Sequence, residues 1–323
     1  MSTHRLDHTR ASSSKASPDA PRPSASLIVV NARNEILLVQ RNPQANAFAG
    51  VHVFPGGNYD AKQDGGSYEM TAIRETFEES GLLLASASSP SGQTKRLELS
   101  DALLDAARQA VHAQRMLFEH VLRAHQLCAD VDALLPFTQW VTPPTSPRRF
   151  HTHFFVAFLP AADAAGFSSG VLQHRLPTPD GGQEVIAARF MHPAVALAEF
   201  RAHRIALMPP QYYLLATLAD ILDGDTARMD QHERVRRLSR SAFGKMVVSP
   251  RAQRASAGRS GHGVGPMVLT YEGDEVRGGA KGRLHRCEVH FGDGGVPTDI
   301  KLLRNFDIFT EIDWTSSVLP SKL

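Results

Sequence analysis

The chain has 323 residues, a hydrophobic fraction of 42% and a formal net charge of +2 at pH 7. This length allows a sizeable core in one large or two modest domains. The small net charge gives no reason to expect nucleic acid or an anionic membrane as a partner. Two cysteines are too few for a disulfide framework, and no apolar run approaches the roughly 18 residues that a membrane span needs. We therefore expect a soluble, intracellular protein.

The first elements predicted along the chain are strands. Residues 1–24 are rich in Ser, Ala, Pro and Arg without apolar periodicity, which predicts a disordered tail. Two strands at 26–30 and 35–40 flank a turn, and a third strand at 51–54 leads into a Phe-Pro-Gly-Gly turn that contains Gly56 and Gly57.

The helix that follows carries the sequence RETFEESGL, the most informative stretch of the chain. Ser67 is its expected N-cap, and Gly81 its expected left-handed stop. Spacings of three and four place Glu75, Glu78 and Glu79 on one face, where their charges repel each other. A cation would relieve that repulsion, and oxygen ligands suit Mg²⁺ or Mn²⁺. A solvated acidic face is the general alternative, but the preceding strand and glycine turn favour a structured metal site.

The middle of the chain adds a helical segment and two strands. Apolar spacing from about 98 to 130 predicts a helical insertion, and 137–160 predicts two strands around a Pro-rich loop. Arg148 and Arg149 precede the second strand. Because arginine binds phosphate through a charged fork, the pair is a candidate substrate site; ordinary surface charge is the alternative. His151 and His153 share a face of this strand and are expected to pack rather than to bind zinc.

The remaining residues predict a β-rich extension. A strand at 184–192 and a helix at 193–202 complete a domain spanning 25–234. From 235 to 318, β-like segments at 267–271, 285–291 and 300–303 predict an extension packed on that domain, and 251–265 is expected to be a flexible loop.

The last five residues, 319–323, end in Ser321-Lys322-Leu323. This tripeptide is a peroxisomal address that an import receptor recognises. We therefore expect a peroxisomal protein. Mitochondrial import through the Arg- and Ser-containing N-terminal tail is the alternative.

The acidic helix resembles the signature box of the Nudix hydrolases. The resemblance rests on a leading glycine, Gly57, and on the second half of the box, which matches at Arg74, Glu75, Glu78, Glu79, Gly81 and Leu82. The gap from Gly57 to Arg74 is three residues longer than the family pattern, and Thr76 replaces an aliphatic residue. The family's first glutamate therefore has three candidate counterparts, which are Asp60, Asp64 and Glu69.

This resemblance implies an α/β (α+β) fold: a Nudix-type α/β/α sandwich with a mixed sheet, a helical insertion and a C-terminal β extension. It implies Glu78 and Glu79 as ligands of Mg²⁺ or Mn²⁺, and Glu75 as a ligand or as the base that orients water. Arg74 would pair with a carboxylate, and Glu184 would be a further ligand or base outside the box. Gly56 and Gly57 would let the backbone approach the phosphates.

Later motifs resemble one branch of the family. Across about 26–223, the order WVTPP, PRRFHTHFF, QEVIAARFMHPAVAL and MPPQYYLLATLAD is similar to the acyl-coenzyme A diphosphatases that carry a helical insertion. The implied reaction cleaves coenzyme A or acyl-coenzyme A into adenosine 3′,5′-bisphosphate and a 4′-phosphopantetheine product. The coenzyme A signature often found upstream of the box is not evident here. NADH or ADP-ribose hydrolysis, and an inactive Nudix-fold binding module, stay open as alternatives.

Overall fold

The computed structural model describes residues 20–44, 49–87, 100–146, 148–159, 179–180, 184–254 and 266–311. The predicted tail up to residue 19 and the Ser321-Lys322-Leu323 tripeptide lie outside the described residues, so the predictions made for them stay predictions. Within the described part of the chain, no helix has the length and apolar character needed to cross a membrane.

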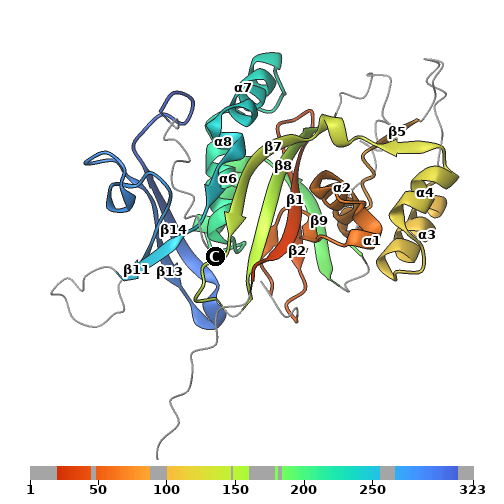
Figure 1. The fold of residues 1–323 in the computed structure, drawn as a ribbon, viewed down its shortest axis with the longest axis horizontal. Helices are drawn as coiled ribbons and strands as arrows, with labels where there is room; N and C mark the ends of the chain where they lie inside the picture. The colour runs from red at the N-terminus through yellow and green to blue at the C-terminus, as the bar shows by residue number, and fades with distance from the viewer. Residues whose placement is uncertain are drawn as a thin grey trace, which may run out of the picture.

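An eight-stranded mixed sheet forms the centre of the molecule, in the order β10-β7-β8-β1-β2-β3, with β4 paired to β1 and β9 to β2 (Figure 1). Its strands are β1 Arg22–Val30, β2 Ile36–Arg41, β3 His52–Val53, β4 Gly56–Asn58, β7 Leu135–Val141, β8 Phe150–Phe158, β9 Val185–Met191 and β10 Val247–Val248. Strand β1 runs parallel to β8 and antiparallel to β2. The central strand is buried on both faces, which explains its continuous apolar run.

Helices cover both faces of this sheet. Leu27 and Val29 of β1 pack with α2 (Tyr68–Ser80), whereas Ile28 and Val30 pack with the helices of the opposite face. That second layer contains α5 Pro193–Arg201, α6 Pro209–Ala219, α7 Met229–Arg240 and α8 Ala242–Lys245. Figure 1 shows α2 and α6 on opposite sides of the strands. The alternation along β1 thus produces the three-layer α/β/α sandwich that the family resemblance implied.

Helix α2 begins and ends where its capping residues predict. The Ser67 hydroxyl accepts a hydrogen bond from the Met70 N–H at 3.2 Å, and Gly81 adopts a φ of 75° while its N–H donates to the Phe77 carbonyl. Both caps satisfy backbone groups that would otherwise lack partners. The four-residue helix α1 (Ala61–Asp64) precedes α2 and ends at Gly65, whose φ is 58°.

The predicted helical insertion forms two helices rather than one continuous segment. They are α3 (Asp101–His112) and α4 (Phe118–Ala124), separated by a turn in which Gln114 has a φ of 54°. Strands β5 (Ala85–Ala87) and β6 (Leu127–Ala129) pair at the base of this insertion, and the short 3₁₀ helix η1 (Val131–Ala133) leads out of it. The apolar spacing identified the buried face but not the break, since both helices share one apolar cluster with α2.

A four-stranded antiparallel sheet follows the second helical layer. Its strands are β11 Arg251–Arg254, β12 Met267–Thr270, β13 His285–Phe291 and β14 Pro297–Arg304, with 3₁₀ helices η3 Glu275–Arg277 and η4 Asp293–Gly295 in its turns. The β character predicted for 267–271, 285–291 and 300–303 is confirmed. The loop predicted from residue 251 is wrong for 251–254, because β11 pairs residue by residue with β12. Its remainder, at 255–265, lies outside the described residues.

This C-terminal sheet shares a hydrophobic core with α6. Leu269, Tyr271 and Val289 belong to the same buried cluster as the α6 side chains. The Tyr213 hydroxyl lies 2.9 Å from His285 Nε2, and the other ring nitrogen of His285 lies 2.7 Å from the Glu272 carbonyl. Burial lowers the pKa of His285 to about 4, so the ring is neutral in this interface at pH 7.

Candidate active site

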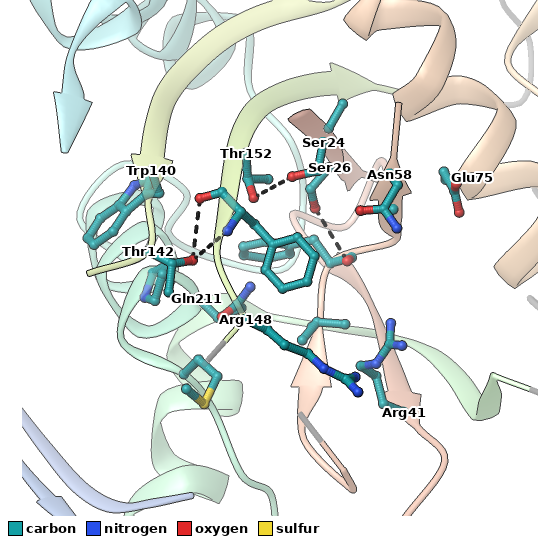
Figure 2. A pocket seen from close by; sticks show the side chains of 18 of the residues that line it. Ser24, Ser26, Arg41, Asn58, Glu75, Trp140, Thr142, Arg148, Thr152 and Gln211 are labelled. Carbon is teal, nitrogen blue, oxygen red and sulfur yellow. Dashed lines mark hydrogen bonds between the residues drawn. The ribbon is translucent and has the colours of Figure 1, made fainter. Parts of the chain in front are cut away.

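A cavity of about 1500 Å³ opens along one face of the molecule, between α2, the strands β4, β7 and β8, and the C-terminal sheet (Figure 2). We call it the active-site cavity. All but one of the site residues predicted from the sequence line it: Gly56, Gly57, Arg74, Glu75, Glu78, Glu79, Arg148 and Glu184. The exception is Arg149, whose Nε donates a hydrogen bond to the Thr142 carbonyl at 3.2 Å.

Arg74 lies at the centre of the acidic group. It is 5% exposed, and its guanidinium binds Asp64 through two hydrogen bonds of 2.7 and 3.0 Å. Its Nη1 atom donates to Glu75 Oε1 and to Glu78 Oε1, both at 2.8 Å. Burial opposes the charged form of Arg74, but the Asp64 hydrogen bond and the neighbouring carboxylates raise its pKa above the ordinary value. Arg74 therefore stays charged and fixes the rotamers of its partners.

Asp64 is the carboxylate that holds Arg74. It is 1% exposed and also accepts hydrogen bonds from the Asp60 N–H and the Thr71 hydroxyl, both at 2.8 Å. Asp60 instead caps α1, and the Glu69 carboxylate accepts from the Ser67 hydroxyl. The sequence could not decide among these three acids, because the residues added to the loop form helix α1. Only the folded position of α1 brings Asp64 into hydrogen-bond contact with Arg74.

The two glycines of β4 lie directly against the glutamates. A Cβ on Gly57 would lie 2.5 Å from the Glu75 Cδ and Oε2 atoms, so no larger residue fits without moving that carboxylate. The Gly56 N–H donates to Glu79 Oε2 at 3.0 Å. The other oxygen, Glu79 Oε1, is buried and has no hydrogen-bond partner within the described part of the chain; its nearest cation is Arg41 Nη1 at 3.8 Å.

The electrostatics of the glutamates favour a bound cation. Burial raises the pKa of Glu75 to about 7, and the nearby Glu78 charge adds to the shift against the opposing effect of Arg74. Burial and the Glu75 charge raise the pKa of Glu79 well above its ordinary value. Glu184 raises both pKa values further.

These residues fit a hard divalent cation. The donor set is entirely oxygen, as Mg²⁺ and Mn²⁺ prefer, and the buried Glu79 Oε1 lacks a hydrogen bond in the described residues. In the part of the chain that the structure describes, no three acidic, His or Cys side chains are yet arranged as metal ligands. Glu75 and Glu78 do not face a common point because each forms an ion pair with Arg74.

Helix α3 of the insertion also reaches the site. Arg108 Nε donates to the Glu78 carbonyl at 2.7 Å, and His112 Nδ1 lies 3.4 Å from Glu78 Oε2. These two residues are four apart and so share one face of α3. Neither residue was predicted from the sequence to belong to the site. Their polar i, i+4 spacing beside an apolar stripe was the only available signal.

Two arginines supply positive charge beside the carboxylates. Figure 2 shows the Arg41 and Arg148 side chains reaching into the same part of the active-site cavity, which both residues line. Arg41 ends strand β2 and was missed in the sequence, where it is one charged residue after an apolar run. The pair is suited to phosphate, since guanidinium groups bind phosphate oxygens in a bidentate manner.

His151 and His153 pack on neighbouring rings, as the sequence predicted. Their rings stack on each other with centroids 4.9 Å apart, and His153 stacks on Tyr68 at 3.9 Å. Burial lowers the pKa of His153 to about 4. These rings support the N-terminal turn of α2 from the neighbouring strand.

Comparison with known proteins agrees with this geometry. Residues 63–218 match a family model described as the NUDT19 Nudix domain. Residues 63–218 therefore form a Nudix domain. Helix α2 is therefore its Nudix helix, and the matched range includes Asp64 as well as the insertion. Arg41, the β4 glycines and the whole C-terminal sheet lie outside that range.

The similar proteins are distant relatives. Acyl-coenzyme A diphosphatase NUDT19 of Xenopus laevis is 25% identical over 238 residues, covering 57% of this chain and 59% of that protein. Putative nudix hydrolase 7 of Caenorhabditis elegans is 28% identical over 208 residues, covering 63% and 62%. A NUDIX hydrolase structure from Alicyclobacillus acidocaldarius aligns with a TM-score of 0.49 and 25% identity over 66% of this chain and 96% of that one. The chain thus spans less than two thirds of the curated relatives it matches.

Proposed function

We propose that this protein is a divalent-cation-dependent diphosphatase that hydrolyses coenzyme A or acyl-coenzyme A to adenosine 3′,5′-bisphosphate and (acyl-)4′-phosphopantetheine. The proposed reaction class rests on one observation. Three glutamates and two arginines line the same cavity: Glu75, Glu78, Glu79, Arg41 and Arg148. The choice of substrate is supported by relatives that bear the name acyl-coenzyme A diphosphatase.

The chain's own residues divide the work of the proposed reaction. Glu78 and Glu79 would hold the cation, with Glu75 and Glu184 beside them. When bound, the cation neutralises charge on the diphosphate and makes water more acidic. Arg41 and Arg148 would bind the phosphate oxygens. Water adds to one phosphorus, the bridging P–O bond breaks, and the bridging oxygen leaves with the other phosphate.

Glu75 is the best placed proton acceptor of the three glutamates. Its pKa of about 7, raised by burial, matches the operating pH of a general base. Arg74 holds the Glu75 Oε1 atom at 2.8 Å and so fixes the direction of the carboxylate. Gly57 packs against its other side.

The test is a substrate panel with a matched pair of variants. Purified protein is incubated with coenzyme A, its acyl esters, NADH and ADP-ribose in Mg²⁺ or Mn²⁺, and products are identified by mass. Glu78→Gln should lower turnover by at least about a hundredfold. Glu69→Gln is the control, because Glu69 lies on the same helix but outside the cavity; its activity should match the wild type.

The outcomes separate the alternatives. Phosphopantetheine released from coenzyme A esters, with NADH and ADP-ribose left intact, supports the proposal. Preferential cleavage of NADH or ADP-ribose replaces the substrate but keeps the chemistry. Tight binding of a panel member without cation-dependent turnover contradicts the enzyme and favours a binding module.

A further inference from the structure

The active-site cavity is larger than the proposed chemistry requires. Its volume is about 1500 Å³, whereas pockets for drug-sized ligands occupy roughly 300–1,000 Å³. The lining carboxylates lie at the Nudix helix and its neighbouring strands, and Arg148 reaches toward Arg41 from the loop between β7 and β8. Away from them, the cavity continues between the start of α6 and the C-terminal sheet. We call this second part the C-terminal chamber, lined by Trp140, Phe154, Met208, Pro209, Pro210, Gln211, Pro250, Ala252, Met267, Leu269, Phe291 and Val296.

One wall of the C-terminal chamber comes from the C-terminal sheet. Met267 and Leu269 are two positions apart on β12, so they project from the same face, and both line the cavity. Ala252 of β11 is paired with Leu269 across the ladder and lines the same wall. None of the lining residues that lie between 250 and 296 is charged. This wall can therefore offer contact to apolar atoms but no charge to a phosphate.

The opposite wall is the first turn of α6. Pro209 and Pro210 begin the helix and have no N–H group, so this turn presents few hydrogen-bond donors to a ligand. Gln211, the next residue, is 8% exposed, and its Oε1 atom has no hydrogen-bond partner among the described residues. A buried acceptor without a partner is costly, and a ligand N–H would remove that cost. Figure 2 shows Gln211 and Trp140 on the side of the cavity away from Glu75.

We propose that the C-terminal chamber binds the acyl-pantetheine arm of the substrate, with the alkyl chain against the sheet wall and Gln211 Oε1 accepting a hydrogen bond from an amide N–H of the pantetheine part. This inference rests on the proposed function and makes the C-terminal sheet a specificity element. The sheet wall of Met, Leu, Ala and Val side chains suits an alkyl chain. A nucleobase would instead require several polar partners around its edge, which this wall does not offer.

The test measures binding without turnover. Affinities of full-length protein for coenzyme A, hexanoyl-coenzyme A and decanoyl-coenzyme A are determined by calorimetry in EDTA. Each methylene that becomes fully buried strengthens binding about fourfold, so the step from hexanoyl to decanoyl should give at least a tenfold gain. Met267→Trp fills the C-terminal chamber and should reduce that gain to less than threefold.

The control places the same side chain on the other face of the strand. Val268 is partly buried like Met267 but does not line the cavity, so Val268→Trp should keep the full chain-length gain. Gln211→Leu should weaken coenzyme A binding about fivefold, the loss of one hydrogen bond. Three outcomes would each overturn the proposal. The chain-length gain could survive in Met267→Trp, both Trp variants could lose it equally, or Gln211→Leu could leave the coenzyme A affinity unchanged.

These results are separable from the proposed function. If coenzyme A is hydrolysed but the chain-length gain is absent, the C-terminal chamber assignment fails and the diphosphatase stands. If the gain is present and no substrate of the panel is hydrolysed, the chamber stands and the diphosphatase fails. If Met267→Trp weakens adenosine 3′,5′-bisphosphate binding tenfold or more, the chamber holds the nucleotide and the proposal is wrong.

Discussion

The two neighbouring glycines of β4 should respond to the same substitution in opposite ways. The three atoms nearest to a Cβ added at Gly57 all belong to the Glu75 carboxylate, at 2.5–2.6 Å, whereas a Cβ at Gly56 would meet the Ala25 carbonyl oxygen at 2.4 Å and the Ser26 Cα at 2.7 Å. Neither glycine has a positive φ, so alanine itself introduces no backbone strain at either position. The difference lies in whether the obstacle is a movable side chain or a strand backbone.

The contacts set the magnitudes. Carbon atoms at rest lie about 3.5 Å apart or more, so Gly57→Ala must push the Glu75 carboxylate by about 1 Å. This movement redirects the carboxylate and its 2.8 Å hydrogen bond to Arg74 Nη1, while Arg74 keeps its bonds to Asp64 and Glu78. A displacement of that size at a reacting group costs about a hundredfold in rate, or about 2.7 kcal/mol in the barrier. Gly56→Ala instead overpacks the sheet, at about 1–3 kcal/mol of stability.

Two measurements distinguish the variants. Differential scanning calorimetry should give Gly57→Ala a Tm within about 1 °C of the wild type, and Gly56→Ala a Tm lower by about 2–6 °C, at roughly 2 °C per kcal/mol. Steady-state hydrolysis of an acyl-coenzyme A should show kcat/KM reduced about a hundredfold in Gly57→Ala. Wild-type activity in Gly57→Ala would refute the placement of Glu75, and equal Tm losses would refute the steric argument.

Three further results follow from the same contacts. Asp64→Asn leaves buried Arg74 without its main partner and should reduce the free energy of unfolding by about 3–5 kcal/mol in urea titrations, while Asp60→Asn, which can still cap α1, should change it little. The Tm should be higher in Mg²⁺ than in EDTA, because a bound cation relieves the repulsion between the carboxylates. The Glu79→Gln variant should show a smaller difference in Tm, and an equal difference would place the cation elsewhere. Burial lowers the pKa of His285 from 6.5 to about 4, so as the pH falls the unfolded chain protonates this ring before the folded protein does. The free energy of unfolding should therefore fall by about 3 kcal/mol between pH 7 and pH 4 because of His285. The His285→Gln variant should lack this part of the loss, and an unchanged pH dependence in the variant would contradict the assignment.

Local patterns in the sequence were sufficient for the Nudix helix. Ser67 and Gly81 marked its ends, and the spacing of Glu75, Glu78 and Glu79 placed three carboxylates on one face, because caps and helical periodicity depend on near neighbours only. The sheet covered on both faces was implied by the resemblance to the Nudix box, and the structure confirms it. The break between α3 and α4 and the strand β11 were missed, because a turn inside a periodic pattern and a ladder to a distant strand leave little local signal.

Only the tertiary structure decided which distant residues complete the site. Arg41 and His112 reach the glutamates from two other elements, and nothing in their own sequence surroundings indicates that meeting. The fold also selects Asp64, among the three acids that the sequence left open, as the partner of Arg74. The same holds for the C-terminal sheet, which the sequence predicted as an extension without assigning it a role in the cavity. Met267 lines the cavity because the shared core with α6 brings β12 there. The sequence by itself determined the reactive helix and its chemistry, whereas packing between remote segments determined the size and lining of the cavity around it.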